Sequence, residues 1–244
     1  MINLKLMYRY FISICLVLGL GLSAQAQTTS KDNKKEVNDT VIYKSPYGLR
    51  LGIDISKPIK ASLDQSYSGF EIVGDYRISK RFFIAAEIGY EEENTVEDYS
   101  NSTAKGSYMR VGFNFNSYKN WLDMNNEIFL GMRYGLSFFD QTLNSYTTNI
   151  TDPDIGIYFP PNTVTTPQTS SLHAHWTEFV VGIKSEVLQN TFIGLSVSYK
   201  ILVSSKEPEN FKTLYAPGFN RIFESGTGFG FNYTVSYLIP FKKK

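Results

Sequence analysis

The chain has almost no cysteine, little histidine and no excess of charge. Its one cysteine, Cys15, lies in an N-terminal apolar segment, so the rest of the chain can form no disulfide and offers no thiol for catalysis. The 24 basic and 23 acidic residues leave a net charge of +1, which argues against a nucleic-acid-binding protein. The apolar run over residues 11–22 has 12 residues, too few for a helix that crosses a bilayer.

Apolar and aromatic residues are plentiful by comparison. Hydrophobic residues make up 42% and aromatic residues 15% of the 244 residues, which excludes disorder and suits one domain or at most two. The mean hydropathy of −0.20 argues against a membrane protein at first sight. A β-barrel escapes that argument, because apolar residues occupy only every second position of its strands.

The N-terminus has the pattern of a secretory signal. Lys5 and Arg9 precede the apolar run, and Ala24-Gln25-Ala26 follows it as a small-x-small cleavage pattern. We predict a signal peptide over residues 1–26, cleaved after Ala26, and a polar tail over residues 27–46. The remaining residues, 47–244, then form the folded domain. The alternative is an N-terminal helix buried in the protein.

Eight segments of this domain alternate with the period of two that is typical of β-strands. One alternating set has 39 positions and no charged residue, whereas the other has 42 positions, of which 14 are charged. The fold is therefore expected to be all-β, with one apolar and one polar face of the sheet. The segments cover residues 49–56, 70–79, 82–91, 108–116, 127–138, 178–186, 192–203 and 228–239.

Either a soluble barrel with the apolar face inside or a membrane barrel with it outside could produce this alternation. The polar face is rich in glycine, which fits a narrow interior, and aromatic residues lie towards the strand ends of the apolar face. Connections alternate between long and short, as in bacterial outer-membrane barrels. We predict an eight-stranded antiparallel up-and-down transmembrane β-barrel. Its long connections are residues 57–68, 92–107, 139–174 and 204–227.

The signal peptide, the eight strands and the terminal aromatic strand resemble the small eight-stranded outer-membrane barrels. Over residues 47–241 the chain is most similar to uncharacterised Gram-negative barrel families of Bacteroidota, classed as domains of unknown function. The resemblance implies the fold and an outer-membrane location. It rests on pattern and topology, and it implies no activity.

The polar set places many charges inside so narrow a barrel. Because an unpaired buried charge is costly, we expect these groups to pair and to form a plug that closes the lumen. The alternative is a polar relay or a narrow pore, although near-equal numbers of both signs favour the plug. The inward charges are Arg50, Asp54, Glu71, Asp75, Arg77, Glu87, Glu91, Arg110, Glu127, Arg133, Glu178, Lys184, Glu186 and Lys200.

No catalytic constellation stands out. His173 and His175 are the only histidines, and a metal site would need a third ligand that is not nearby in sequence. Outer-membrane lipid A deacylases carry a His-x-Ser pair, which the segment from His175 to Thr177 resembles only loosely, with threonine in place of serine. We therefore predict no enzyme activity, no catalytic residues, no metal and no cofactor.

Residues 139–174 are the best candidate for binding, since exposed apolar residues on a loop can mark an interaction site. The alternative is that this loop packs onto the barrel rim. The candidate interaction residues are Tyr146, Ile155, Tyr158 and Phe159.

The predicted function is an outer-membrane barrel of structural or interaction type, either a loop-presenting scaffold or a subunit of an envelope complex. Its partners would be outer-membrane lipid and, through the long loops, other envelope proteins, with no nucleic acid. A narrow pore or transport protein is the alternative, and a lipid-modifying enzyme comes after it.

Overall fold

The computed structural model describes residues 46–118, 125–158, 163–208 and 211–243. All of them belong to the unit Tyr43–Lys244, the second of the two units into which the chain divides. The predicted signal peptide and nearly all of the predicted polar tail lie outside the described residues, as do residues 119–124, 159–162, 209–210 and 244.

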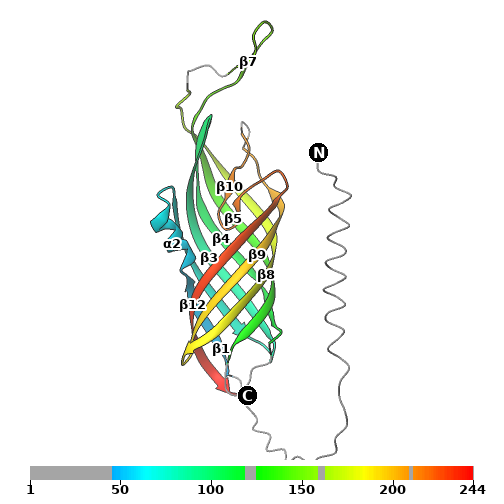
Figure 1. The fold of residues 1–244 in the computed structure, drawn as a ribbon. Helices are drawn as coiled ribbons and strands as arrows, with labels where there is room; N and C mark the ends of the chain where they lie inside the picture. Colours follow the sequence, from blue (N-terminus) through cyan, green and yellow to red (C-terminus); the bar gives the residue numbers. More distant parts are fainter. Residues whose placement is uncertain (1–45, 119–124, 159–162, 209–210, 244) are drawn as a thin grey trace, which may run out of the picture. The chain divides into compact units, whose positions relative to one another are not determined.

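Eight antiparallel strands form one closed ring (Figure 1). Neighbours in the sequence are neighbours in the sheet, and the ring closes because β1 pairs with both β2 and β12. The predicted all-β fold of eight antiparallel strands is thereby confirmed. The strands are β1 (Pro46–Asp54), β2 (Tyr67–Arg77), β3 (Phe82–Glu97), β4 (Ser100–Asn116), β5 (Glu127–Tyr146), β8 (Gln168–Leu188), β9 (Thr191–Ser205) and β12 (Thr227–Lys243).

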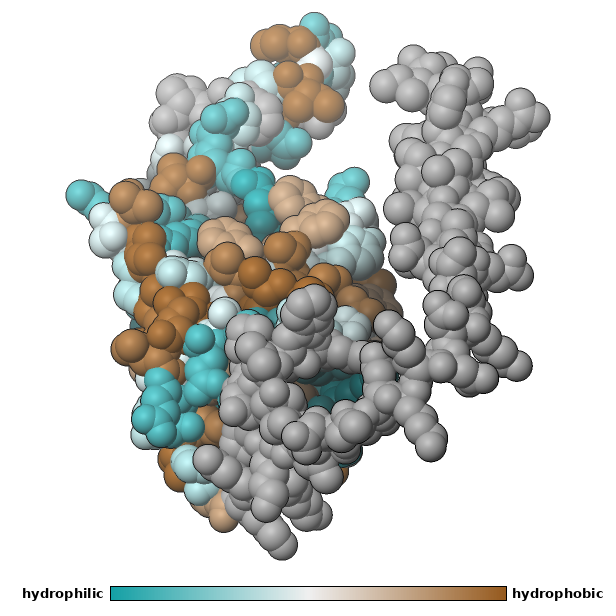
Figure 2. Space-filling view, turned by 60° about the horizontal axis from the view of Figure 1, so that its bottom comes forward, coloured by the Kyte–Doolittle hydropathy of each residue, from teal (hydrophilic) through white to brown (hydrophobic). Residues whose placement is uncertain are grey.

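The two alternating sets of residues separate completely between the faces of this ring. None of the apolar set is buried and none of the polar set is exposed. On β2, for example, Phe70 and Ile72 are 51% and 48% exposed, whereas Glu71 between them is 0% exposed. Hydrophobic side chains accordingly recur along the visible outer wall (Figure 2). The apolar residues therefore face outward, which is the reverse of a soluble barrel.

Two of the predicted long loops are mostly strand, so those loop boundaries were wrong. The β3–β4 ladder continues to Glu97 and Ser100, well inside the predicted loop 92–107. The β5–β8 ladder likewise continues to Leu143 and Gln168, inside the predicted loop 139–174. In the β3–β4 extension both faces carry polar residues. In the β5–β8 extension the alternation is inverted, because Phe139, Leu143 and Leu172 are buried inside whereas Asp140 and Ser171 lie on the outer face. The outward apolar set therefore marks only the lower part of these four strands.

The described residues between the two ends of this ladder, 144–158 and 163–167, form a projection at the top of Figure 1. It contains a small hairpin of β6 (Ile150–Asp152) and β7 (Gly156–Tyr158). At its base, the backbone of Tyr146 forms a two-residue bridge with Val164. This segment, residues 147–167, is called the projecting hairpin below.

The segment between β1 and β2 contains a short helix that the sequence pattern did not predict. This helix, α2 (Ser56–Leu63), lies in the expected loop 57–68 and has no buried residue. It has eight residues, which is too short for a clear period of 3.6. Its two large apolar residues, Ile59 and Leu63, do share one face, but two residues are too few to separate a helix from a loop by pattern.

The connection between β9 and β12 folds into the mouth of the barrel and packs against residues of the predicted loop 139–174, since Phe139, Leu172 and Ala174 share one buried cluster with it. It carries β10 (Tyr215–Ala216) and β11 (Asn220–Arg221). Tyr215, Ala216 and Phe219 are at most 4% exposed and pack with Tyr108 and Trp176 of the barrel wall. Residues 211–226 are called the inserted loop below.

Candidate functional site: a charged lumen beneath an open cavity

The lower lumen is built around Arg50 on β1. Its Nε donates to Asp75 Oδ1 at 2.7 Å, and its Nη1 and Nη2 donate to the two carboxylate oxygens of Glu127 at 2.7 and 3.0 Å. Lys184 forms a further ion pair with Asp75. The guanidinium also lies 4.9 Å from the ring centre of Phe83, so charge pairing and stacking hold it together.

The middle lumen is built around Arg110 on β4. This guanidinium lies 2.6 Å from Glu71, 2.8 Å from Glu87 and 3.3 Å from Glu178. Arg133 supports the same cluster through Glu87 at 3.2 Å. The five residues come from β2, β3, β4, β5 and β8, so the cluster connects five of the eight strands across the lumen. Together with the lower cluster it is called the ion-pair plug.

Neutral side chains complete the hydrogen bonding of these buried carboxylates. Tyr108 Oη donates to Glu71, and Trp176 Nε1 donates to Glu178 at 2.6 Å. Asn232 Nδ2 donates to Glu71 Oε1 at 3.1 Å. Sequence reasoning missed these donors. Tyr108 and Asn232 do occupy the inward alternating set, so polar neutral residues among inward charges were the available signal.

Glu91 joins the barrel wall to the segments that cover it. Its carboxylate accepts hydrogen bonds from Lys57 Nζ at 2.5 Å, Tyr67 Oη at 3.1 Å, Tyr215 Oη at 2.7 Å and the Gly218 backbone N–H at 2.8 Å. Lys57 belongs to α2, while Tyr215 and Gly218 belong to the inserted loop. One buried carboxylate therefore anchors both covering segments.

These contacts change the ionisation of the covering segments. Burial alone would lower the pKa of Lys57, but the charges of Glu91 and Glu71 outweigh it, and the pKa is raised above its usual value. Burial and the adjacent Glu91 charge raise the pKa of Tyr215 well above its usual value. Lys57 is therefore held as a cation, and Tyr215 is held neutral.

Lys200 clamps the inserted loop from β9. Its Nζ donates to the Gly218 carbonyl at 2.6 Å and lies 4.0 Å from Glu178. Gly218 has a φ of +79°, and a Cβ there would lie 2.5 Å from Cδ2 of Tyr108. Glycine is therefore required both by the backbone conformation and by the close approach to the tyrosine ring.

Three of the expected lumen charges have other roles. Asp54 accepts the Tyr233 backbone N–H at 3.0 Å and the Asn232 side chain at 2.7 Å, at the point where β1 ends. Arg77 lies 4.8 Å from the ring centre of Phe83. Glu186 accepts hydrogen bonds from Asn125 and from the Asn190 backbone near the opposite end of the barrel.

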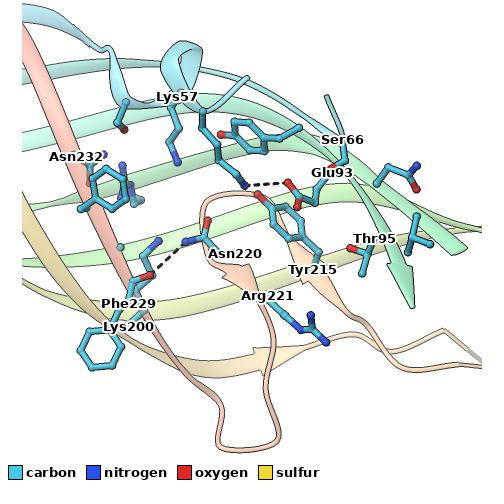
Figure 3. A pocket seen from close by; sticks show the side chains of 18 of the residues that line it. Lys57, Ser66, Glu93, Thr95, Lys200, Tyr215, Asn220, Arg221, Phe229 and Asn232 are labelled. Carbon is cyan, nitrogen blue, oxygen red and sulfur yellow. Dashed lines mark hydrogen bonds and ion pairs between the residues drawn. The ribbon is translucent and has the colours of Figure 1, made fainter. Parts of the chain in front are cut away.

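Above the ion-pair plug lies a cavity of about 650 Å³ (Figure 3). Side chains of α2, β2, β3, β12 and the inserted loop surround it. Five cations line it, of which Arg110 and Lys200 form its floor, and the lining acids are Glu93 and Glu97. Two cavities in the middle and lower lumen measure only about 40 and 10 Å³. The open volume of the barrel is therefore concentrated at its mouth.

The candidate interaction residues lie apart from this cavity. Ile155 and Tyr158 are 74% and 38% exposed on the projecting hairpin, and Ile157 between them is 68% exposed. Tyr146 is half-buried at the base of the hairpin. Phe159 lies outside the described residues.

The two histidines form no metal site with their neighbours. His173 is exposed, and His175 Nδ1 lies 2.7 Å from the hydroxyl of Tyr134. In the part of the chain that the structure describes, no group of three or more His, Cys, Asp or Glu is placed to hold a metal ion. No helix within the same residues is long and apolar enough to cross a membrane.

Comparison with known protein families decides one point. Residues 7–244 match the Domain of unknown function DUF6048. The chain belongs to the DUF6048 family. This confirms the expected membership of an uncharacterised family, and the DUF6048 match covers the barrel and residues 7–26 of the predicted signal peptide. No curated protein matches the chain.

Proposed function

We propose that this DUF6048 protein is an outer-membrane β-barrel of structural or interaction type, which presents its projecting hairpin to other envelope proteins. The proposal includes export by a signal peptide cleaved after Ala26 and a Gram-negative source among the Bacteroidota. Outer-membrane lipid would surround the barrel. No enzyme activity is proposed for it.

The observation that carries the membrane proposal is the complete separation of the two residue sets. An outward surface of 39 positions on eight strands without a charge is far larger than the apolar patches that soluble monomers expose. Exposing this surface to water would cost free energy, and lipid removes that cost because the bilayer interior is as apolar as these side chains. Outward-facing aromatic pairs such as Phe82–Phe115 and Tyr199–Phe229, each with ring centres 5.1 Å apart, suit the two interfacial belts.

The ion-pair plug supports a structural role over a pore. A cavity of about 10 Å³ holds roughly one water molecule, so the lower lumen offers no continuous aqueous path. The charges there are matched between arginine and carboxylate, whereas a selective pore usually presents a ring of one sign. Purified protein in planar bilayers is therefore expected to give no stable conductance, and a large stable conductance would overturn the plug.

The membrane location is tested by fractionation. The folded chain should co-fractionate with the outer membrane and show heat-modifiable mobility on gels, because small barrels resist unfolding by detergent until they are boiled. Export that ends in a soluble periplasmic protein would refute the proposal.

The interaction role is tested by shortening the projecting hairpin. Replacing residues 148–163 with a short glycine-serine linker leaves the β5–β8 ladder intact, since that ladder ends at Leu143 and Gln168. The variant should keep its heat-modifiable mobility and lose envelope partners in crosslinked pull-downs. A matched control is Ile155→Ser with Ile157→Ser, which keeps the hairpin length and removes its two most exposed apolar side chains. Unchanged partners in both variants would count against the role.

A further inference from the structure

The wall of the barrel is incomplete beside the cavity at its mouth. β1 has nine residues, and its ladders end at Thr234 on β12 and at Ile72 on β2. Above that level, β12 continues to Thr227 and β2 to Tyr67. No other strand among the described residues pairs with these two edges, so the strand wall has a gap there, and α2 lies against both β2 and β12 beside it.

Asp54 ends the β1 ladder at this gap. The Ile55 backbone N–H still donates to the Tyr233 carbonyl at 2.8 Å, but the Tyr233 N–H turns to the Asp54 carboxylate. The chain then leaves the sheet and enters α2. A side-chain carboxylate thus takes the place of the next backbone carbonyl, and β12 loses its neighbour from Asn232 upward.

The cavity reaches both faces of β12 at this free edge. Phe229, Gly230, Phe231 and Asn232 all line it, although alternate residues of a strand point to opposite faces. In an intact wall, only the inward pair could line an interior cavity. The cavity is therefore continuous with the outer surface of the barrel through the gap.

The two ends of this passage differ in chemistry. Its inner part is charged, and the five cations that line it are Lys57, Lys60, Arg110, Lys200 and Arg221. Lys57, Arg110 and Lys200 lie against the buried carboxylates of Glu91 and the ion-pair plug. Lys60 and Arg221 are the two lining cations whose carboxylate partners also line the cavity. Its outer rim is apolar, with Phe229, Phe231 and Phe70 exposed by 72%, 71% and 51%. On α2, Ile59 and Leu63 are also exposed, by 48% and 83%.

We propose that this passage is a lateral binding site for a phosphorylated lipid. The phosphate headgroup lies against Lys60 and Arg221 in the cavity, and the acyl chains leave beside α2, between β12 and β2, into the surrounding bilayer. A volume of about 650 Å³ accommodates a headgroup but not a whole lipid, so the chains must leave through the gap. The inference rests on the proposed membrane location and adds a ligand class to it.

Lys60 and Arg221 are the cations best suited to test the site. Their side chains are 45% and 56% exposed, so their removal should not disturb the barrel. Each pairs with one carboxylate at the rim, at 3.1 Å for Glu93 and 2.6 Å for Glu97. A phosphate can compete for both cations without entering the ion-pair plug.

The experiment is native mass spectrometry of the full-length mature protein released from detergent or nanodiscs. Four probes are compared: phosphatidylglycerol, a lipid A-type phosphoglycolipid, uncharged diacylglycerol and inorganic phosphate. The heat-modifiable band is checked first on the same preparation. Loss of that band refutes the membrane proposal, whereas loss of lipid retention with the band intact refutes only the lateral site.

We expect one of the two phosphorylated lipids to be retained, and the better of them identifies the source. The double variant Lys60→Gln, Arg221→Gln should weaken retention roughly five- to tenfold, because two partly exposed ionic contacts are lost. The matched control Lys105→Gln, Lys206→Gln removes two exposed cations that do not line the cavity and should leave retention unchanged. Equal retention of diacylglycerol, or binding of inorganic phosphate with no lipid retained, would overturn the proposal. Equal weakening by the control pair would also overturn it.

Discussion

The lower lumen and the mouth of this barrel both contain cations and carboxylates, but these charges close the lower lumen and surround an open cavity at the mouth. Around Arg50 and Arg110, cations and carboxylates pair at 2.6 to 3.3 Å and leave cavities of about 40 and 10 Å³. At the mouth, Lys60 and Arg221 are half-exposed and face a cavity of about 650 Å³. The difference follows from the length of β1, because the ring of strands is complete only as far as β1 extends.

Where the wall is complete, side chains have no room except against one another, so every charge must find a partner. Where the wall is incomplete, a helix and an inserted loop cover the lumen in place of a strand. Those covering segments depend on a few contacts, among which Glu91 and Lys200 are central. Charge therefore holds the lower lumen shut, and at the mouth it remains available to a ligand.

The largest effect is expected from Arg110→Ala. It leaves Glu71, Glu87 and Glu178 without their shared cation, and uncompensated buried charge costs about 3–5 kcal/mol. The urea midpoint of the heat-modifiable band should fall steeply, while conductance stays absent. Adding Glu71→Gln and Glu178→Gln should recover part of the loss. A midpoint equal to wild type would show that the plug does not stabilise the barrel.

Gly218→Ala should act on the mouth alone. The new Cβ would lie 2.5 Å from the Tyr108 ring at a φ of +79°, so the inserted loop must shift, at a cost of roughly 1–3 kcal/mol. Limited proteolysis should then cut within residues 211–226 while the barrel stays heat-modifiable. The control is Gly226→Ala, which has a φ of +61° but open space, with its nearest neighbour at 3.8 Å. Equal cutting of both variants would attribute the effect to backbone strain alone.

The sequence predicts those parts of this arrangement that depend on neighbouring residues, and it does not predict those that depend on distant ones. The division into two alternating residue sets was predicted correctly, because alternation along a strand is a local property that can be seen in β2 or β9 alone. The partners of each charge were not predictable. Arg50 meets Glu127, 77 residues away, because of how the ring closes and staggers, which no local pattern records.

The covering segments were missed for a related reason. Tyr215 and Gly218 sit in a sequence that is typical of a surface loop, and only the acceptor at Glu91 gives them a buried position. The residue at which β1 ends could not be predicted from the sequence either. Asp54 belongs to the inward alternating set like its neighbours, and its use as a backbone acceptor appears only in the structure.

Alkaline pH is expected to release the covering segments at the mouth and to leave the lower lumen folded. This is the next largest effect. Lys57 faces Glu91, Glu71 and Arg110, and Tyr215 faces Glu91, Tyr67 and Glu93; both have raised pKa values. A raised pKa means that the protonated form is favoured in the folded state. Its stabilisation is complete below the usual values of 10.5 for Lys57 and 10.0 for Tyr215, and it is lost as pH rises above them.

Trp176 reports this release, because it is 0% exposed and its ring centre lies 5.8 Å from that of Phe219 on the inserted loop. In a Trp121→Phe background, where it is the one remaining tryptophan, acrylamide quenching should rise between pH 10 and 11.5 while the barrel stays heat-modifiable. Tyr215→Phe should remove part of that pH dependence. Quenching that does not change over this pH range would refute the expected loss of stabilisation at alkaline pH.

The smallest effect is expected from Lys60→Gln. Its ion pair with Glu93 is partly exposed, and its Nζ lies 3.7 Å from the ring centre of Tyr67, so the loss should stay below about 1 kcal/mol after solvent screening. The urea midpoint of the heat-modifiable band measures it beside Arg110→Ala. A fall as large as that of Arg110→Ala would mean that the rim cations are committed to the fold like those of the plug. The contrast between a closed lumen and an available mouth would then not hold. A small fall leaves Lys60 free to exchange Glu93 for an anion at little cost to the barrel.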